Sequence, residues 1–202
     1  MSVEIHPLSP EWVKGAVALQ SACFPPPFPP ELLWQEAHLF RHLEVFPEGQ
    51  FVASFEGRVV GSASSIRVST ESWSQPHTWD DLTGGLFLTG HNPAGSLLYG
   101  VDISVHPGFR GRGIARLLYQ ARFSLVKALG LEGFVTICRL PDFSASGFSN
   151  IEDYAKAVVK NELTDRTMTP LLKLGLTCTG VAHDCMEDEE SGNSGARLEW
   201  RR

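Results

Sequence analysis

The sequence predicts an α/β (α+β) fold in a single domain over residues 1–202, and three observations support this. Strand-like runs alternate with amphipathic helical segments along the chain. The Glu56-Gly57 turn joins two strand-like runs and predicts an antiparallel hairpin. A strongly apolar run, a glycine-rich loop and a long helical stretch then follow one another over 97–129, as in many α/β units.

The first third of the chain predicts one short strand and two helices. Val3 and Ile5 alternate with polar residues, and a helix follows over about 10–22. The segment Phe24–Pro30 has five prolines in seven residues, which makes it a stiff, extended connection. It is either a spacer or a loop that shapes a substrate mouth. A second helix then ends near Pro47.

The middle of the chain holds the predicted hairpin, over 51–55 and 58–67, and a long segment without periodicity at 69–96. A loop of that length inside a compact domain is usually functional or disordered, and its aromatic content favours a functional loop. Its aromatic residues either floor a substrate pocket or pack in the ordinary way: Trp73, Trp79 and Phe87.

A central strand is predicted over 97–105. Strict alternation places Leu97, Tyr99, Val101, Ile103 and Val105 on one face, with Leu98, Gly100, Asp102 and Ser104 on the other. A helix follows over 113–129, ended by Gly130. The remaining elements are a strand at 133–140, helices at 151–160 and 166–174, and strands at 176–184 and 195–201.

Composition narrows the class of protein. Seventeen Lys+Arg against 23 Asp+Glu give a formal net charge of -6. This charge disfavours a protein that binds nucleic acid or an anionic membrane, and it is compatible with a cationic substrate such as an amine. The four cysteines are scattered and predict reduced thiols. Neither a secretion signal nor a membrane-length apolar run is present in the sequence. We expect a soluble, cytoplasmic protein.

The start of the helix at 113–129 carries the strongest functional pattern. Arg110, Arg112 and Arg116 crowd this end, where cations oppose the helix dipole. Together with glycines that bare the backbone N–H groups, they indicate a bound anion. A P-loop would need Gly-Lys-Ser/Thr, and a dinucleotide fingerprint would need a third glycine where Arg116 stands.

The hexapeptide Arg110-Gly111-Arg112-Gly113-Ile114-Ala115 resembles the acetyl-CoA site of the GNAT (Gcn5-related) N-acetyltransferases, [QR]-x-x-G-x-[GA]. The resemblance is greatest to the acetyltransferase modules found fused to carbon–nitrogen hydrolases, and it covers roughly residues 75–200. The motifs that carry it are WDDLTGG, HNPAGSLLYGVDISV, Arg139-Leu140-Pro141, EDYAKAV and EESGNSGARLEW.

The resemblance implies a strongly twisted mixed sheet of about six or seven strands, with helices on both faces and a splay between the central strands. Backbone amides from Arg110 to Ala115 would hold the pyrophosphate of coenzyme A, and the backbones of Ile103 and Val105 would pair with its pantetheine arm. The implied activity moves an acetyl group from acetyl-CoA to a primary amine of a small molecule or protein, in a ternary complex without metal. The alternative is a silent acyl-CoA sensor.

Acyl transfer needs a neutral amine, so a base is useful. Asp102 is the candidate base, although it could equally bond to nearby backbone or to Arg139. Tyr154 is the candidate acid, with a packing role as the alternative. Many GNAT enzymes carry a tyrosine at the position that Leu171 occupies here, and this departure keeps the sensor reading open.

Polar and acidic residues cluster near the C-terminus, over 183–190. His183, Asp184, Cys185 and Glu187 lack recurring ligand spacing, so no metal site is expected. Glu187–Glu190 is either a solvated acidic loop or an attractor for a cationic acceptor. The sequence is compatible with a homodimer.

Overall fold

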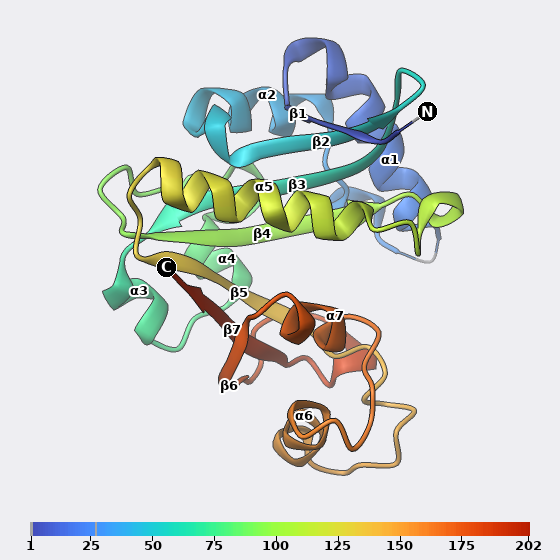
Figure 1. The fold of residues 1–202 in the computed structure, drawn as a ribbon, viewed down its shortest axis with the longest axis vertical. Helices are drawn as coiled ribbons and strands as arrows, with labels where there is room; N and C mark the ends of the chain where they lie inside the picture. The colour runs from blue at the N-terminus through green and yellow to red at the C-terminus, as the bar shows by residue number, and fades with distance from the viewer. Residues whose placement is uncertain (1, 27) are drawn as a thin grey trace.

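A computed structural model describes residues 2–26 and 28–202 of the chain, and their core element is one seven-stranded sheet (Figure 1). The strand order is β1-β2-β3-β4-β5-β7-β6, and every neighbouring pair is antiparallel except β4–β5. The strands are β1 (Glu4–Pro7), β2 (Gln50–Phe55), β3 (Arg58–Val68), β4 (Leu97–Val105), β5 (Gly133–Arg139), β6 (Thr177–Ala182) and β7 (Gly195–Arg201). The predicted mixed sheet is therefore confirmed.

Helices cover both faces of this sheet. The long helix α5 (Ile114–Ala128) buries Ile114 and Leu118 against β2 and β3, and in Figure 1 it runs in front of the sheet, along the direction of β3 and β4. On the opposite face, α1 (Val13–Cys23) packs on β3 and β4, and α2 (Glu36–Val45) packs against α1. Two shorter helices, α6 (Ile151–Val159) and α7 (Met168–Lys173), lie beside the C-terminal strands. None of the described helices is long and apolar enough to cross a membrane.

The parallel pair β4–β5 opens into a splay. Its ladder joins only Leu97–Tyr99 to Gly133–Val135. Beyond this point β4 continues to Val105 and β5 to Arg139, and the two strands diverge in Figure 1. The backbone of β4 after Tyr99 consequently has no strand partner on its β5 side, which leaves it available to an extended ligand.

A β-bulge interrupts β4 at the mouth of this splay. Ser64 of β3 pairs with Asp102, whereas the next residue, Ser65, pairs with Gly100, so β4 carries Val101 as an extra residue. The strict alternation predicted for 97–105 holds as far as Val101, which shares a cluster with Leu97 and Tyr99. It is wrong from Asp102 onward, because the inserted residue reverses the faces of all that follow. Asp102 and Ser104 face α1, and Ile103 and Val105 pack on the α5 side.

The segment 69–96, predicted as a loop, contains two short helices, α3 (Thr70–Ser74) and α4 (Trp79–Thr83). A capping box at Thr78 begins α4, and this helix of five residues is too short to show a periodic pattern in the sequence. Trp73 is 2% exposed, donates its indole N–H to Glu199 at 2.7 Å and stacks under the Arg197 guanidinium at 4.0 Å. Trp73 is therefore part of the folded core and Trp79 packs against it, whereas Phe87 is 45% exposed.

Candidate active site

The loop between β4 and α5 leaves its backbone open. Gly111 and Gly113 have φ values of +77° and +78°, a region that side-chain-bearing residues rarely adopt. A Cβ atom placed on either glycine would meet no atom within 4 Å, so these glycines serve the turn and not the packing. The open surface lies directly over the first turn of α5.

The N-terminus of α5 is uncapped. Its N-cap residue is Gly113, which supplies no side-chain hydrogen bond. Among the described residues, no acceptor is recorded for the backbone N–H groups from Gly111 to Arg116. Unsatisfied N–H groups at the positive end of a helix dipole form an anion-binding site.

The arginines of this loop lie at the surface. Arg110 donates from Nε to the Val105 carbonyl at 3.2 Å, and Arg112 lies 4.9 Å above the Phe109 ring. The Ile114 side chain is buried in the core, whereas Ala115 is exposed. Of the amides predicted to bind the cofactor over 110–115, that of Arg110 already donates to the Pro107 carbonyl at 3.4 Å. Ile103 and Val105 lie on the strand that leads to this loop.

Asp102 lies where the splay begins, on the face covered by α1. Its Oδ2 accepts hydrogen bonds of 3.3 Å from Gln20 Nε2 and from Ser104 Oγ. Burial raises the pKa of Asp102 from 3.8 to about 6, although the Arg122 guanidinium and the bonds from Ser104 and Gln20 oppose this rise. Such a pKa suits a carboxylate that accepts a proton near neutral pH.

Three consecutive carbonyls around the bulge are each held by a side chain from another element. The Thr136 hydroxyl donates to the Gly100 carbonyl at 2.9 Å, and the Trp79 indole donates to the Val101 carbonyl at 3.2 Å. The Asp102 carbonyl accepts from the Arg122 guanidinium. The irregular backbone around Asp102 is therefore held by side chains from β5, α4 and α5.

The structure does not bring Tyr154 together with Asp102. Tyr154 is 0% exposed within the core beside α6 and α7, and its hydroxyl donates to Asp165 at 2.9 Å. Burial and the neighbouring Asp165 carboxylate raise its pKa. Leu171 is likewise buried in the same cluster. A catalytic role for Tyr154 stays a prediction.

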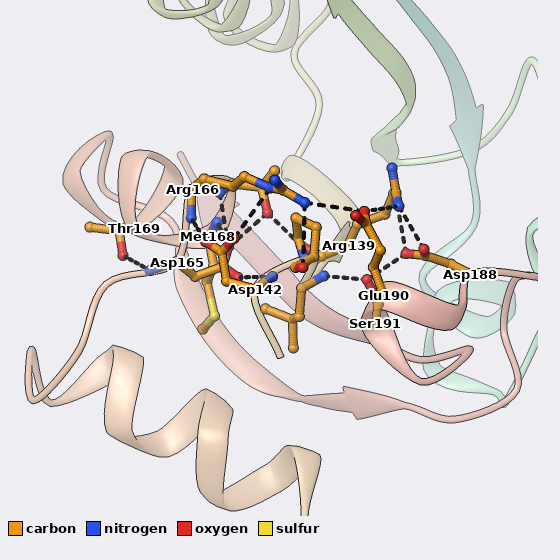
Figure 2. A network of polar contacts seen from close by, with 12 residues as sticks. Arg139, Asp142, Asp165, Arg166, Met168, Thr169, Asp188, Glu190 and Ser191 are labelled. Atoms are coloured by element: carbon orange, nitrogen blue, oxygen red, sulfur yellow. Dashed lines mark hydrogen bonds and ion pairs between the residues drawn. The ribbon is translucent and has the colours of Figure 1, made fainter. Parts of the chain in front are cut away.

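A network of charged and polar side chains lies at the end of β5 (Figure 2). Arg139, at the end of β5, donates two 2.6 Å hydrogen bonds to Asp188 and one of 3.2 Å to Glu190. Glu190 also accepts from Arg166 at 3.1 Å. Two residues of the acidic stretch 187–190, Asp188 and Glu190, thus form ion pairs with arginines. The sequence does not indicate these pairs, because the partners lie far apart along the chain.

An apolar groove of about 300 Å³ lies beside the C-terminal end of α1. It is lined by Ser21, Phe24, Pro26, Phe28, Pro30 and Leu33, so the described part of the proline segment forms its wall. Pro27, within that segment, lies outside the described residues. Phe24 follows Gln20 by one helical turn, which places the groove next to the residue that binds Asp102.

The residues at 183–187 do not form a metal site. His183 pairs with Glu152 at 2.6 Å, and Cys185 is buried. Within 2–26 and 28–202, no group of three His, Cys, Asp or Glu side chains is arranged to hold a metal ion.

Comparison with known proteins connects this geometry to a family. The model of the acetyltransferase (GNAT) family matches residues 13–148. Two curated Bacillus subtilis proteins are similar. The uncharacterized N-acetyltransferase YkwB is 36% identical over 191 residues, 94% of this chain and 84% of YkwB. The probable hydrolase YhcX is 34% identical over 186 residues, which cover 91% of this chain but 36% of YhcX.

Solved structures share the fold at lower identity. The GphF GNAT-like decarboxylase in complex with isobutyryl-CoA superposes with a TM-score of 0.81 at 23% identity over 98% of both chains. The loading GNATL domain of CurA from Lyngbya majuscula gives 0.83 at 16% identity, covering 100% of this chain and 98% of that domain. With the splayed strands, the open helix N-terminus and the family match over residues 13–148, the chain belongs to the GNAT acetyltransferase family.

Proposed function

We propose that the protein is an N-acyltransferase that moves an acetyl group from acetyl-CoA to a primary amine by direct attack in a ternary complex. The observation that carries the proposal is the open N-terminus of α5, which lies at the end of a splayed strand that presents a partly buried carboxylate, Asp102. Anion binding and proton acceptance are the two functions that such a transfer requires of the protein.

The donor fits the backbone features of β4 and α5. The N–H groups from Gly111 to Ala115 have no acceptor among the described residues and would bind the pyrophosphate of coenzyme A. Beyond Tyr99, β4 has no partner on its β5 side, so the backbones of Ile103 and Val105 would pair with the pantetheine arm as an added strand does.

The base must remove a proton from the acceptor. A lysine-like amine is neutral in about one molecule in 2,500 at pH 7, a cost of roughly 4.6 kcal/mol. Asp102, with a pKa of about 6, is mostly ionised at pH 7 and would accept this proton directly or through water. Because the Tyr154 hydroxyl is buried and bonded to Asp165, we propose water as the proton source for the departing thiolate.

The acceptor would enter on the α1 face, between the proline segment and the segment 69–96. Asp102 faces this side, and the groove beside Phe24 and Phe28 offers an apolar wall for the part of the acceptor that does not react. We propose a small molecule or a protein N-terminus or lysine as the source of the amine. Rings of Phe24 and Phe28 4.9 Å apart, in a proline-rich segment, make this wall stiff.

Calorimetric titration with acetyl-CoA tests the donor site. Arg112→Ala removes a charge beside the open amides and should weaken binding about tenfold, the effect of one charge-assisted contact. Lys127→Ala is the matched control, because it removes one exposed charge from the last turn of the same helix, about 20 Å away. Absence of binding at millimolar acetyl-CoA, or equal weakening by both variants, contradicts the proposed site.

Turnover is tested with a panel of amines and detection of the free thiol. Asp102→Asn should abolish turnover and leave the affinity for acetyl-CoA unchanged, since Asp102 does not lie in the pyrophosphate loop. Tyr154→Phe should retain turnover if water protonates the thiolate, and a complete loss would assign the acid role to Tyr154. Tight binding without turnover of any amine would favour the acyl-CoA sensor.

A further inference from the structure

Arg122 is a positive charge held inside the core, and it forms no direct ion pair with a carboxylate among the described residues. It lies on α5, is 1% exposed, and packs with its guanidinium 5.3 Å from the Tyr119 ring centre and 5.5 Å from that of Phe134. Throughout residues 2–26 and 28–202, no carboxylate oxygen lies within 4.0 Å of its nitrogens. Burying a guanidinium in this way is unfavourable unless its hydrogen bonds are satisfied, so its position calls for a reason.

Three hydrogen bonds of the Arg122 guanidinium go to the two strands that form the bulge. Nη2 donates to the Ser64 carbonyl at 2.6 Å and to the Asp102 carbonyl, and Nε donates to Ser65 Oγ at 3.1 Å. Ser64 and Ser65 are the β3 residues between which the register shifts. A planar fork of donors suits carbonyls that a bulge has turned away from the ladder, and an ammonium group could not serve all three acceptors with that geometry.

Arg122 also opposes the effect of burial on the Asp102 carboxylate. Among the described titratable groups, Arg122 and Tyr119 on α5 and Cys23 on α1 interact with the Asp102 carboxylate. Burial raises the pKa of Tyr119 and that of Cys23, so both are neutral between pH 5 and 8. Burial lowers the pKa of Arg122, but a guanidinium stays protonated in proteins. Arg122 is therefore the ionised one of the three groups.

We infer that Arg122 is a positioning residue, whose guanidinium clamps the β4 bulge from the α5 side and keeps Asp102 ionised as the proton acceptor on the α1 side. Arg122 holds the main-chain carbonyl of Asp102, and Gln20 and Ser104 hold the Asp102 carboxylate. Asp102 is therefore fixed from both faces of the sheet. The catalytic consequence rests on the proposed acyl transfer, whereas the effect on the ionisation of Asp102 does not.

The test compares Arg122→Met and Arg122→Lys with wild type. The titration of the Asp102 carboxyl is followed by carbon-13 NMR without any substrate, and its signal is assigned by its loss in Asp102→Asn. Arg122→Met removes the charge and should raise the pH at which Asp102 titrates by at least about one unit. Arg122→Lys keeps a charge, so its Asp102 should titrate closer to wild type than that of Arg122→Met.

Arg197→Met is the matched control. The Arg197 guanidinium also stacks on an aromatic ring and donates to a main-chain carbonyl, but it does so at Trp73, under the C-terminal strands. This variant should lose stability and leave the titration of Asp102 unchanged. A folded Arg122→Met protein whose Asp102 titrates as in wild type overturns the inference, whatever the outcome of the activity assays.

Kinetics separate positioning from simple stability. Once an amine that is turned over has been identified, the ascending limb of kcat against pH should shift to higher pH in Arg122→Met. The shift should equal the change in the Asp102 titration that NMR records. In Arg122→Lys, kcat should fall at least tenfold at a pH where Asp102 is fully ionised, because the fork that orients the bulge is lost. If Arg122→Met does not fold, Arg122→Lys decides, and an unchanged kcat in that variant overturns the clamp.

Discussion

Replacing Asp102 by asparagine should stabilise the protein at neutral pH while removing its proposed base. In the folded state burial raises the pKa of Asp102 from 3.8 to about 6, so the fold binds the proton more tightly than the unfolded chain does. The ionised carboxylate is therefore a destabilising group in the native protein, and a neutral side chain of the same shape relieves this cost.

The magnitude follows from the two pKa values. At about 1.36 kcal/mol per unit, the rise from 3.8 to about 6 corresponds to about 3 kcal/mol of unfolding free energy. Between these two pH values the native state binds more protons, so stability falls as the pH rises, and above about pH 6 the loss is complete. Because Asp102 retains partial exposure, about 3 kcal/mol is an upper bound, from which the weakened bonds of Gln20 and Ser104 subtract.

Urea unfolding of wild type and Asp102→Asn at pH 4, 6 and 8 measures this effect. We expect the variant to gain stability relative to wild type as the pH rises from 4 to 8, with no further gain above pH 8. Ser62→Ala is a useful control, since this buried β3 hydroxyl has no hydrogen-bond partner among the described residues and its removal should give a pH-independent change. A difference between Asp102→Asn and wild type that does not vary with pH would falsify the burial argument.

Three further predictions concern the surroundings of the site. Gly113→Ala should cost about 1 kcal/mol in urea unfolding because φ is +78°. Gly108→Ala should cost little, because its φ is ordinary and the added Cβ would make only a van der Waals contact with His106 at 3.5 Å. Trp79→Phe removes the donor to the Val101 carbonyl, so it should lower stability by about 1 kcal/mol and also lower turnover; unchanged turnover would show that this carbonyl needs no partner. Burial alone would raise the pKa of Asp188, but hydrogen bonds from Arg139 and Ser191 hold it below 3.8. Arg139→Met should therefore lose about 1 kcal/mol at pH 7, a difference from wild type that disappears as acid protonates Asp188; a constant difference would exclude this ion pair as its source.

The elements of the fold could be predicted from local patterns. Periodicity located α5 and β4 to within a residue or two, and the glycines with arginines at 110–116 identified the open helix start, because these signals are contained in short stretches of sequence. The hairpin followed from the Glu56-Gly57 turn in the same way.

The geometry around Asp102 could not be predicted, because it depends on residues far apart in the chain. An alternating run gives no sign of an inserted residue, and the bulge at Val101 is held by Arg122 from α5 and Trp79 from α4. The same limit applies to Arg139, whose partners Asp188 and Glu190 come from a distant loop. Side chains that hold irregular backbone do not produce a periodic pattern in the sequence.

Trp79 joins three segments that are separate in the sequence. Its indole holds the Val101 carbonyl of β4, and its own main-chain N–H donates to the Cys185 carbonyl at 2.9 Å, in the connection between β6 and β7. A chimaera that exchanges the stretch 69–96 with a relative would therefore leave 183–194 without its anchor. Grafting acceptor preference between members of the family should succeed only when both stretches are transplanted as a pair.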